Sequence, residues 1–513
     1  MNPVELSIFA NRLNAVCDEM GAVLQRAAFS PNIRDRLDFS CAVFDAQGDL
    51  CAQAAHIPVH LGSMAFAMRD LVKSLAWGPG DMVVVNDPFL GGTHLPDVTL
   101  IAPVFAAEQL VGYVVNRAHH ADIGGDTPGS MPISQTLDEE GIVIPPRHLL
   151  RRGELNQSLL QQILGVTRNQ QIGQGDFAAQ ISANKTGVKR LGRIIAQLGI
   201  TSYTHALDAL NDYGERLARY VLANIPSGTY TFEDYMDDDG LGHTRLPIRL
   251  QLRIDQQGVN ADFSGSAAQT AGNINCPLSV VAAAVYYVFR CLMPAQTPAC
   301  AGSFRPIVLH VPVGCLLNAQ RPAAVAAGNV ETSTRIVDVV MGALAKAIPQ
   351  AIPAASHGSM NNLAMGGIWH GRFWDYYETM GGGMGAGRRY PGLAAVQTHM
   401  TNTRNTPIEV MENAYPVRVR KYAVRTGSGG SGQHSGGEGL CREIEFLAPA
   451  TITLLSERRL LAPWGLQGGQ AAKPGANWLN GHALPGKVSR EVASGDILRI
   501  ESAGGGGWGE AAV

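Results

Sequence analysis

The 513 residues are enough for two or three domains, each with a hydrophobic core of its own. The 40 basic and 43 acidic residues give a formal charge of -3 without long runs of one sign, which argues against nucleic acid or an anionic membrane as a partner. The eight cysteines form no C-x-x-C pair and the start lacks the features of a signal peptide, so we expect a reduced, cytoplasmic protein.

The first predicted elements are a helix, a hairpin and a second helix. Apolar residues recur at helical spacing from residue 6 to 24, after an Asn2-Pro3 pair that is typical of a helix start. The stretch DFSCAVFDAQGDLCAQA at 38–54 predicts two short strands joined through a glycine turn. Residues 63–76 predict the second helix.

Three strands are predicted next, at 82–86, 98–105 and 110–118. Because only four residues separate the last two, they should form an antiparallel hairpin. A turn centred near residue 107 would place Asp97 opposite residue 117.

The middle of the chain alternates between helices and strands. Residues 155–224 predict helices, 228–263 predict short strands, and 276–350 return to helices. The apolar stretch at 276–289 is shorter than the roughly 20 residues that cross a bilayer, so it predicts a buried helix and no membrane partner.

The C-terminal part is rich in glycine, and no helix is predicted from residue 358 onward. The glycines gather at 380–440 and 502–509, where we expect tight turns. The fold class should be α+β, with mixed helices and antiparallel sheets. The expected domains are residues 1–200 with a metal site, 201–355 of mixed α and β structure, and 356–513 of glycine-rich β structure.

A metal site is predicted from the hairpin. The loop before one strand carries His94 and Asp97, and His119 follows the paired strand, so all three should meet at one end. Imidazole and carboxylate groups suit zinc, manganese or iron(II), and three ligands leave room for water or substrate. The alternative is an aspartate that caps a turn beside one core and one surface histidine.

Two other patterns in the sequence are weaker evidence for a binding site. His56 and His60 have i, i+4 spacing, but Pro58 between them argues against one helical face, so we expect them to support the core or a loop outside the metal site. The segments GHALPGKV at 481–488 and GSGGSG at 427–432 imitate phosphate-binding loops, yet no helix is predicted after either.

Several motifs, in order along the chain, resemble the hydantoinase B/oxoprolinase family. They are RLDFSCAVFD, HIPVHLGSM, NDPFLGGTHLPDVTLIAPVF, HHADIGG, PGSMP, GDFAAQISAN, ADFSGSAAQTAGNINCP and SGGSGQHSGGEG. The resemblance extends over essentially the whole chain. It implies one subunit of an ATP-dependent enzyme that opens a cyclic amide such as a hydantoin, 5-oxoproline or a lactam.

The resemblance also implies ligands and a partner. His94, Asp97 and His119 match the family's metal ligands, and Asp38 would be the fourth. Without the resemblance, the position of Asp38 among charged residues is more typical of a surface salt-bridge cluster. The partner would be a hydantoinase A-type subunit that binds ATP and phosphorylates the carbonyl oxygen of the small ring substrate. A hetero-oligomer is therefore expected.

Further roles follow from this reading. His120 and Asp122 are candidates for moving protons to and from a water on the metal, or for supporting the ligands by hydrogen bonds. Glu331 and Arg335 are candidates for contacting the substrate. Two alternative functions stay open, a subunit of an ATP-dependent ketone carboxylase and a scaffold that the metal only stabilises.

Overall fold

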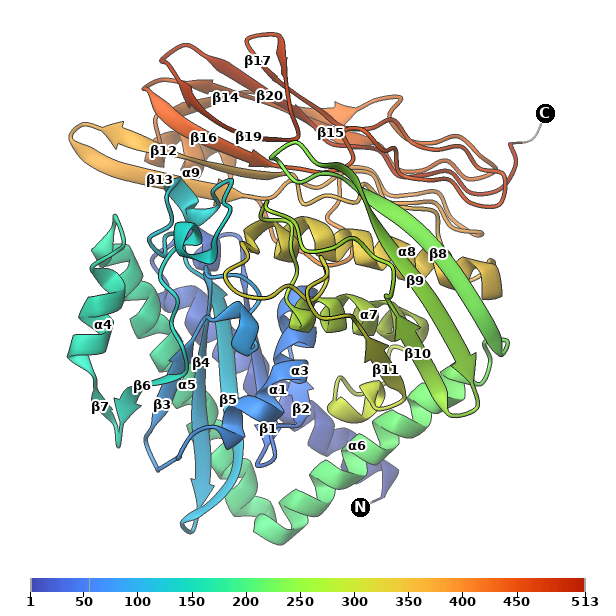
Figure 1. The fold of residues 1–513 in the computed structure, drawn as a ribbon. Coiled ribbons are helices and arrows are strands. Elements are labelled where there is room, and N and C mark those ends of the chain that lie inside the picture. Colours follow the sequence, from blue (N-terminus) through green and yellow to red (C-terminus); the bar gives the residue numbers. More distant parts are fainter. Residues whose placement is uncertain (1, 55, 512–513) are drawn as a thin grey trace.

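The computed structural model describes residues 2–54 and 56–511. Its helices alternate with four sheets along the chain, so the predicted α+β class is confirmed (Figure 1). The strands of one sheet lie within residues 39–155, those of a second within 228–310, and those of the other two within 362–501. The expected domain boundaries near 200 and 355 stay a prediction.

The N-terminal region is a seven-stranded sheet with helices on both faces. Helix α1 (Pro3–Ala27) starts with a capping box between Asn2 and Glu5, as its sequence start predicts. It packs with α5 on one face of the sheet, and α3 covers the other. The sheet order is β2-β1-β5-β4-β3-β6-β7, with β1 (Phe39–Asp45), β2 (Leu50–Gln53), β3 (Met82–Val85), β4 (Asp97–Ala106), β5 (Gln109–His119), β6 (Arg147–Arg151) and β7 (Glu154–Leu155). The other helices are α2 (Pro31–Arg34), α3 (Pro58–Lys73), α4 (Gln157–Leu164), α5 (Gln170–Leu198) and α6 (Ile200–Leu222).

The hairpin of β4 and β5 forms as predicted, but its predicted register was wrong by two residues. Asp97 pairs with His119 instead of residue 117. The turn consists of Ala107 and Glu108, both with positive φ. Opposite Val104 and Phe105, a β-bulge adds one residue to β5. A bulge cannot be read from the alternation of residues, so the simple turn-centred register missed it.

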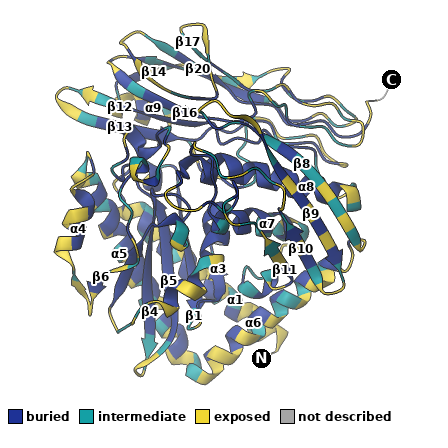
Figure 2. Ribbon diagram, in the orientation of Figure 1, coloured by how far each residue is buried: buried dark blue, intermediate teal, exposed yellow. Residues whose placement is uncertain are grey.

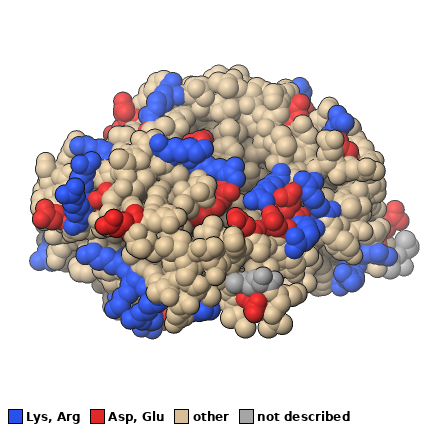
Figure 3. Space-filling model, turned by 90° about the horizontal axis from the view of Figure 1, so that it is seen from below, with Lys and Arg blue, Asp and Glu red and all other residues tan. Residues whose placement is uncertain are grey.

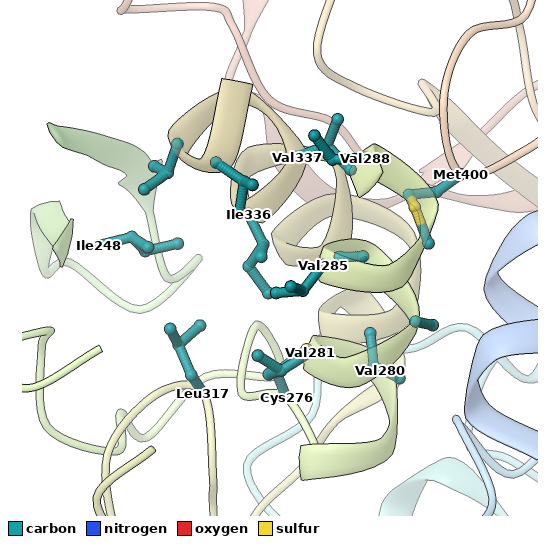
Figure 4. Packing of buried hydrophobic residues seen from close by; sticks show 14 of the residues in the cluster. Ile248, Cys276, Val280, Val281, Val285, Val288, Leu317, Ile336, Val337 and Met400 are labelled. Carbon is teal, nitrogen blue, oxygen red and sulfur yellow. The ribbon is translucent and has the colours of Figure 1, made fainter. Parts of the chain in front are cut away.

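The middle region packs two buried helices against a curved sheet. The sheet order is β11-β10-β9-β8, with β8 (Gly228–Asp238), β9 (Thr244–Asp255), β10 (Gly258–Asp262) and β11 (Ile307–His310). Helix α7 (Leu278–Leu292) confirms the predicted buried helix, and α8 (Ser333–Ala347) follows a π-helical turn, η5 (Gly328–Thr332). Val281 and Val285 of α7 face Ile336 of α8 and Ile248 of β9 in the largest core cluster (Figure 4). None of the helices in the described residues has the length and apolar character that a bilayer crossing requires.

The C-terminal region forms two further sheets that lie over the central helices (Figure 1). Their orders are β13-β12-β16-β19 and β14-β15-β20-β17-β18. The strands are β12 (Asn362–Trp369), β13 (Arg372–Glu378), β14 (Val417–Arg425), β15 (Gly439–Phe446), β16 (Ala450–Leu455), β17 (Ala476–Leu479), β18 (His482–Leu484), β19 (Lys487–Val492) and β20 (Ile497–Glu501). One short helix, α9 (Ile408–Ala414), contradicts the expectation that this part has no helix. Seven residues are too few to show a helical period.

The glycine-rich segments are extended chains that run side by side, so the expectation of tight turns was wrong for most of them. Gly437 N donates to Met384 O at 2.8 Å, and Gly505 N donates to Gly437 O at 2.9 Å. A Cβ added to Gly436 would lie 1.8 Å from Gly505 O. The glycines here allow backbones to approach closely, which no larger residue would permit.

Burial follows this layering. The strands β4 and β5 and the central helices α7 and α8 are almost wholly buried, whereas α4, α6 and the outer sheet edges alternate between buried and exposed residues (Figure 2). On the face seen from below, basic and acidic side chains lie interspersed (Figure 3). The segment 481–488 runs from β18, which pairs with β17, into β19, which pairs with β16 in another sheet, and Lys487 is buried against Glu457 at 2.6 Å. Its lysine is therefore already paired inside the protein.

Candidate metal centre

Three side chains from the β4–β5 hairpin come together in the interior. His94 lies in the loop before β4, Asp97 is the first residue of β4, and His119 is the last residue of β5. One donor atom from each lies within 4.8 Å of the others, and all three residues are buried. Within the described residues, no other group of three such side chains meets this spacing.

The two histidines present their Nε2 atoms to the centre. His94 Nδ1 lies 3.2 Å from the carbonyl oxygen of Ala326, and His119 Nδ1 lies 3.0 Å from the carbonyl oxygen of His120. A carbonyl oxygen can only accept, so His94 Nδ1 carries a proton towards Ala326. His119 Nδ1 lies between the His120 carbonyl and Asn32 Nδ2, which is 3.2 Å away, and the shorter contact with the carbonyl favours the proton on Nδ1 there too. In the part of the chain that the structure describes, neither Nε2 has a hydrogen-bond partner. Backbone carbonyls that orient metal-binding imidazoles in this way are common in metal sites.

The electrostatics of the cluster favour metal binding at Asp97 and His119 and proton binding at His94. Burial lowers the pKa of the His94 imidazole, but the neighbouring Asp97 outweighs burial and raises it. Burial opposes ionisation of Asp97, yet His60 and His94 outweigh it and hold the pKa of its carboxyl well below the usual range. Burial and then the neighbouring His94 lower the pKa of His119, so its imidazole is neutral. A carboxylate, a neutral imidazole and a second imidazole on which a metal ion would replace a proton fit a divalent ion such as zinc, manganese or iron(II).

His94 and His119 border a small cavity of about 20 Å³, which is room for an ion and little else, and Asp97 converges with them beside it. Its other walls come from distant parts of the chain, namely Asp38, Ile57, Val59, His60, Asn329, Val330, Met360, Tyr377, Thr379 and Thr401. The Tyr377 ring stacks on His119 with centroids 4.9 Å apart, and Arg36 lies over the same ring at 4.8 Å. All three regions of the protein therefore contribute to this cavity.

His60 lies beside the cluster, although the sequence argued for a role elsewhere. Its Nε2 is 3.1 Å from Asp97 Oδ1 and 3.9 Å from Asp38 Oδ1. Pro58 is the first residue of α3, where proline is tolerated, so it starts the helix that carries His60 instead of breaking it. His56 precedes this helix, and its Nδ1 accepts the Cys41 N–H at 3.1 Å.

Asp38 is brought to the cavity but is not one of the three converging donors. Its Oδ2 lies 3.7 Å from Arg36, and burial raises the pKa of its carboxyl. The role of a fourth ligand stays a prediction.

His120 and Asp122 do not reach the centre, and both border a separate cavity of about 10 Å³. His120 Nε2 is paired with Gln180 Oε1 at 3.0 Å. Asp122 accepts hydrogen bonds from Ser130 and Arg168, which organise the loop after β5. Their contacts fit structural support, and the geometry gives no basis for the proton-moving role that we expected.

Glu331 and Arg335 also lie away from the cavity. Glu331 Oε1 accepts from Met360 N at 3.0 Å and Asn362 Nδ2 at 2.7 Å. Arg335 is fully buried and contacts Glu457 at 3.2 Å. Both tie α8 and its preceding turn to the C-terminal sheets. These contacts fit a structural role and give no support to the substrate contact that we expected.

Two residues that sequence reasoning did not single out support the centre. Asn329 on η5 points its Nδ2 at Asp97 Oδ2 over 3.3 Å. Glu140 Oε1 accepts the N–H groups of Val325 and Ala326, each at 2.9 Å, and so fixes the carbonyl that orients His94. No spacing in the sequence connects Asn329 or Glu140 with the hairpin. Each acts through contacts between residues more than 180 positions apart, and the position of Asn329 also depends on the π-helical turn.

Comparison with known proteins finds relatives that match this chain over almost its whole length. Residues 2–511 match the family model of hydantoinase B/oxoprolinase. The chain is 40% identical to 5-oxoprolinase 1 of Arabidopsis thaliana over 99% of its own length and 42% of that protein. It is 30% identical to a putative D-/L-hydantoinase B-type subunit of a Pseudomonas species, over 99% and 90%. The chain spans about two fifths of the length of the 5-oxoprolinases that it matches.

A solved structure shares the fold as well. It is an ATP-dependent caprolactamase from Pseudomonas jessenii, with a TM-score of 0.92 and 26% identity over 99% of this chain and 91% of that one. Together with the match over residues 2–511, this shows that the chain belongs to the hydantoinase B/oxoprolinase family.

Proposed function

We propose that this chain is the metal-dependent component of an ATP-dependent cyclic amide hydrolase. The observation that carries the proposal is the convergence of His94, Asp97 and His119 in the buried interior, where the two histidines border a small cavity. In the described part of the chain neither Nε2 makes a hydrogen bond, and His94 Nε2 has Asp97 Oδ2, a second potential ligand, at 3.4 Å.

The reaction needs help because amide nitrogen donates electrons into the ring carbonyl and leaves poorly. Phosphorylation of the carbonyl oxygen removes that donation, which is the step we assign to ATP. An ion held by His94, Asp97 and His119 would supply a Lewis acid that lowers the pKa of a coordinated water. Burial keeps bulk water away from the activated ring, and Asp97 supplies the negative charge that retains the ion.

The residue placed to move a proton is His60. Its Nε2 faces both Asp97 and Asp38 on the cavity wall, and its Nδ1 lies 3.4 Å from Ser40 Oγ. It can therefore exchange a proton with a group in the cavity while Ser40 holds the other side of the ring. We assign to His60 the role that the sequence suggested for His120.

We place the ATP site on a partner, a hydantoinase A-type subunit. Neither sequence segment that resembles a phosphate loop leads into a helix. One runs from β18 into β19 and has its lysine paired with Glu457, and the other lies among the extended glycine-rich segments. The Pseudomonas relative is a putative hydantoinase B-type subunit, and the caprolactamase is ATP-dependent, which together support this division of labour. The substrate class is a hydantoin, 5-oxoproline or a lactam, in a hetero-oligomer.

The test combines metal analysis with activity of the assembled enzyme. We expect about one divalent ion per chain in the purified wild type and a near-complete loss in His94→Ala and His119→Ala. Both variants, combined with the ATP-binding partner, should lose ring opening. His148→Ala, a histidine on β6 outside the cavity, is the control. Activity that survives in folded, metal-free variants would favour the scaffold, and incorporation of labelled bicarbonate would favour the carboxylase.

A further inference from the structure

The side chain of Asn329 enters the cavity from the π-helical turn η5. It is 2% exposed and is one of the residues that border the cavity. A π-helical turn widens the helix by one residue and often occurs at functional sites. Here it places an amide side chain within 3.3 Å of Asp97 Oδ2.

Asp97 decides which way the Asn329 amide points. A carboxylate only accepts hydrogen bonds, so the NH2 group of Asn329 must face Asp97, and the reverse orientation would set two oxygens against each other. The carbonyl oxygen Oδ1 is left over. It is buried and has no hydrogen-bond partner among residues 2–54 and 56–511.

A second buried asparagine, Asn273, serves as a comparison for Asn329. Asn273 is also fully buried, its Nδ2 donates to Pro132 O at 2.6 Å, and its Oδ1 likewise lacks a partner in the described residues. Asn273 is not among the residues that border the cavity, and its Nδ2 is hydrogen-bonded to Pro132 instead of to a residue of the metal centre. Of the two asparagines, Asn329 is the one that combines an unused acceptor with a position beside the converging donors.

We propose that Asn329 Oδ1 accepts the N–H of the substrate's ring amide and thereby selects secondary amide rings. This inference rests on the proposed function and names a specificity residue for it. Hydantoins, 5-oxoproline and lactams all carry an N–H next to the carbonyl carbon. When the carbonyl oxygen is phosphorylated, the ring that keeps this proton has the more electrophilic carbon, and an acceptor at the N–H stabilises that form. Rings with a substituted nitrogen, and lactones, offer no hydrogen here.

The cavity also sets a condition on binding. At about 20 Å³ it is too small for a five- to seven-membered ring, so its walls must part when the ring enters. Asn329 and the three donors lie on rigid elements, namely η5, the β4–β5 hairpin and its loop. The preference for an N–H should therefore persist through the opening.

The experiment compares binding of ε-caprolactam and N-methylcaprolactam to the full chain loaded with Zn²⁺, by isothermal titration or ligand-observed NMR. The wild type should bind ε-caprolactam about tenfold more tightly, the value of one well-placed hydrogen bond in a buried site. Asn329→Ala and Asn329→Leu, which keeps the volume, should lose this preference because they weaken only the N–H ligand. Asn273→Ala, with an equally buried amide removed, should keep it.

Several results would overturn the inference. They are equal binding of the two lactams by the wild type, binding of neither, or a preference that survives in both Asn329 variants. A loss of zinc in Asn329→Leu would assign Asn329 to the metal site, as a ligand or through its hydrogen bond to Asp97, and would reject the role in substrate selection. Metal content measured in parallel keeps the two proposals apart, since a metal-free wild type that still prefers the N–H lactam contradicts the proposed function alone.

Discussion

Asp97 and His119 are direct partners in the β4–β5 ladder, so one strand pair brings two donors to the same face of the sheet. His94 joins them because the turn before β4 closes with Asp97 N donating to His94 O at 3.1 Å. The spacing of the cluster is therefore set by backbone pairing within a hairpin that is buried on both faces. Its side chains are held in place before any ligand arrives.

Metal should stabilise the fold measurably. A ligand that binds only the native state at a hundred times its Kd adds about 2.7 kcal/mol to the free energy of unfolding. We expect a chelator to lower the melting temperature of the wild type and added Zn²⁺ to restore it, as followed by calorimetry. His119→Ala should show neither change, whereas His120→Ala, at the adjacent position, should respond like the wild type. An equal response of both variants would contradict the site.

Glu140 should control metal affinity without contacting the metal. Its carboxylate holds the backbone of Val325 and Ala326, and the Ala326 carbonyl orients His94. We expect Glu140→Ala to weaken Zn²⁺ binding by about 10- to 100-fold, as is typical for residues that orient ligands. Competition with a chromogenic chelator measures this. Glu139→Ala, one residue away, should leave the affinity unchanged, and a weakening as large as that of Glu140→Ala would point to general damage of the loop.

Much of the fold could be predicted from the sequence. The opening helix, the first hairpin, the three strands that build the site and the buried helix at 276–289 each have a clear period or turn signal. The glycine-rich segments could not be interpreted correctly, because composition does not distinguish a glycine that turns the chain from one that permits close packing. Gly436 and Gly505 are of the second kind.

The candidate site was predictable only as far as local spacing reaches. His94, Asp97 and His119 share one hairpin, so their meeting follows from strand pairing even with the register in error. Asn329 and Tyr377 come from other regions, and their approach depends on tertiary packing. His120 was misplaced for a simpler reason, because neighbouring residues at a strand end point to opposite sides.

Glu331 should make stability fall as pH rises. Burial, and then the charge of Glu457, raise its pKa from 4.5 to about 8. Between these two values the unfolded chain releases the proton and the folded chain retains it, so the free energy of unfolding decreases by up to about 1.4 kcal/mol per pH unit. Glu331→Gln lacks this carboxyl, and its stability relative to the wild type should rise from pH 5 to pH 8.

Denaturant titrations at several pH values measure this difference. The other titrating groups are present in both proteins, and they cancel unless they face Glu331 as Glu457 does. Glu154→Gln, at an exposed glutamate, is the control. A difference between Glu331→Gln and the wild type that stays constant with pH would show that the folded protein keeps Glu331 ionised.

Two glycine exchanges should act in opposite directions. A Cβ on Gly436 would lie 1.8 Å from Gly505 O, whereas a Cβ on Gly192, inside α5, would meet nothing within 4 Å. We expect Gly436→Ala to lose about 3 kcal/mol of stability, because one of two closely packed backbone segments must move. Gly192→Ala should gain about 0.5–1 kcal/mol, because alanine loses less backbone freedom than glycine in a helix. Unfolding in urea measures both. A mild effect of Gly436→Ala would mean that the extended glycine segments are loosely packed, and the close backbone contacts would then not explain why glycine is used there.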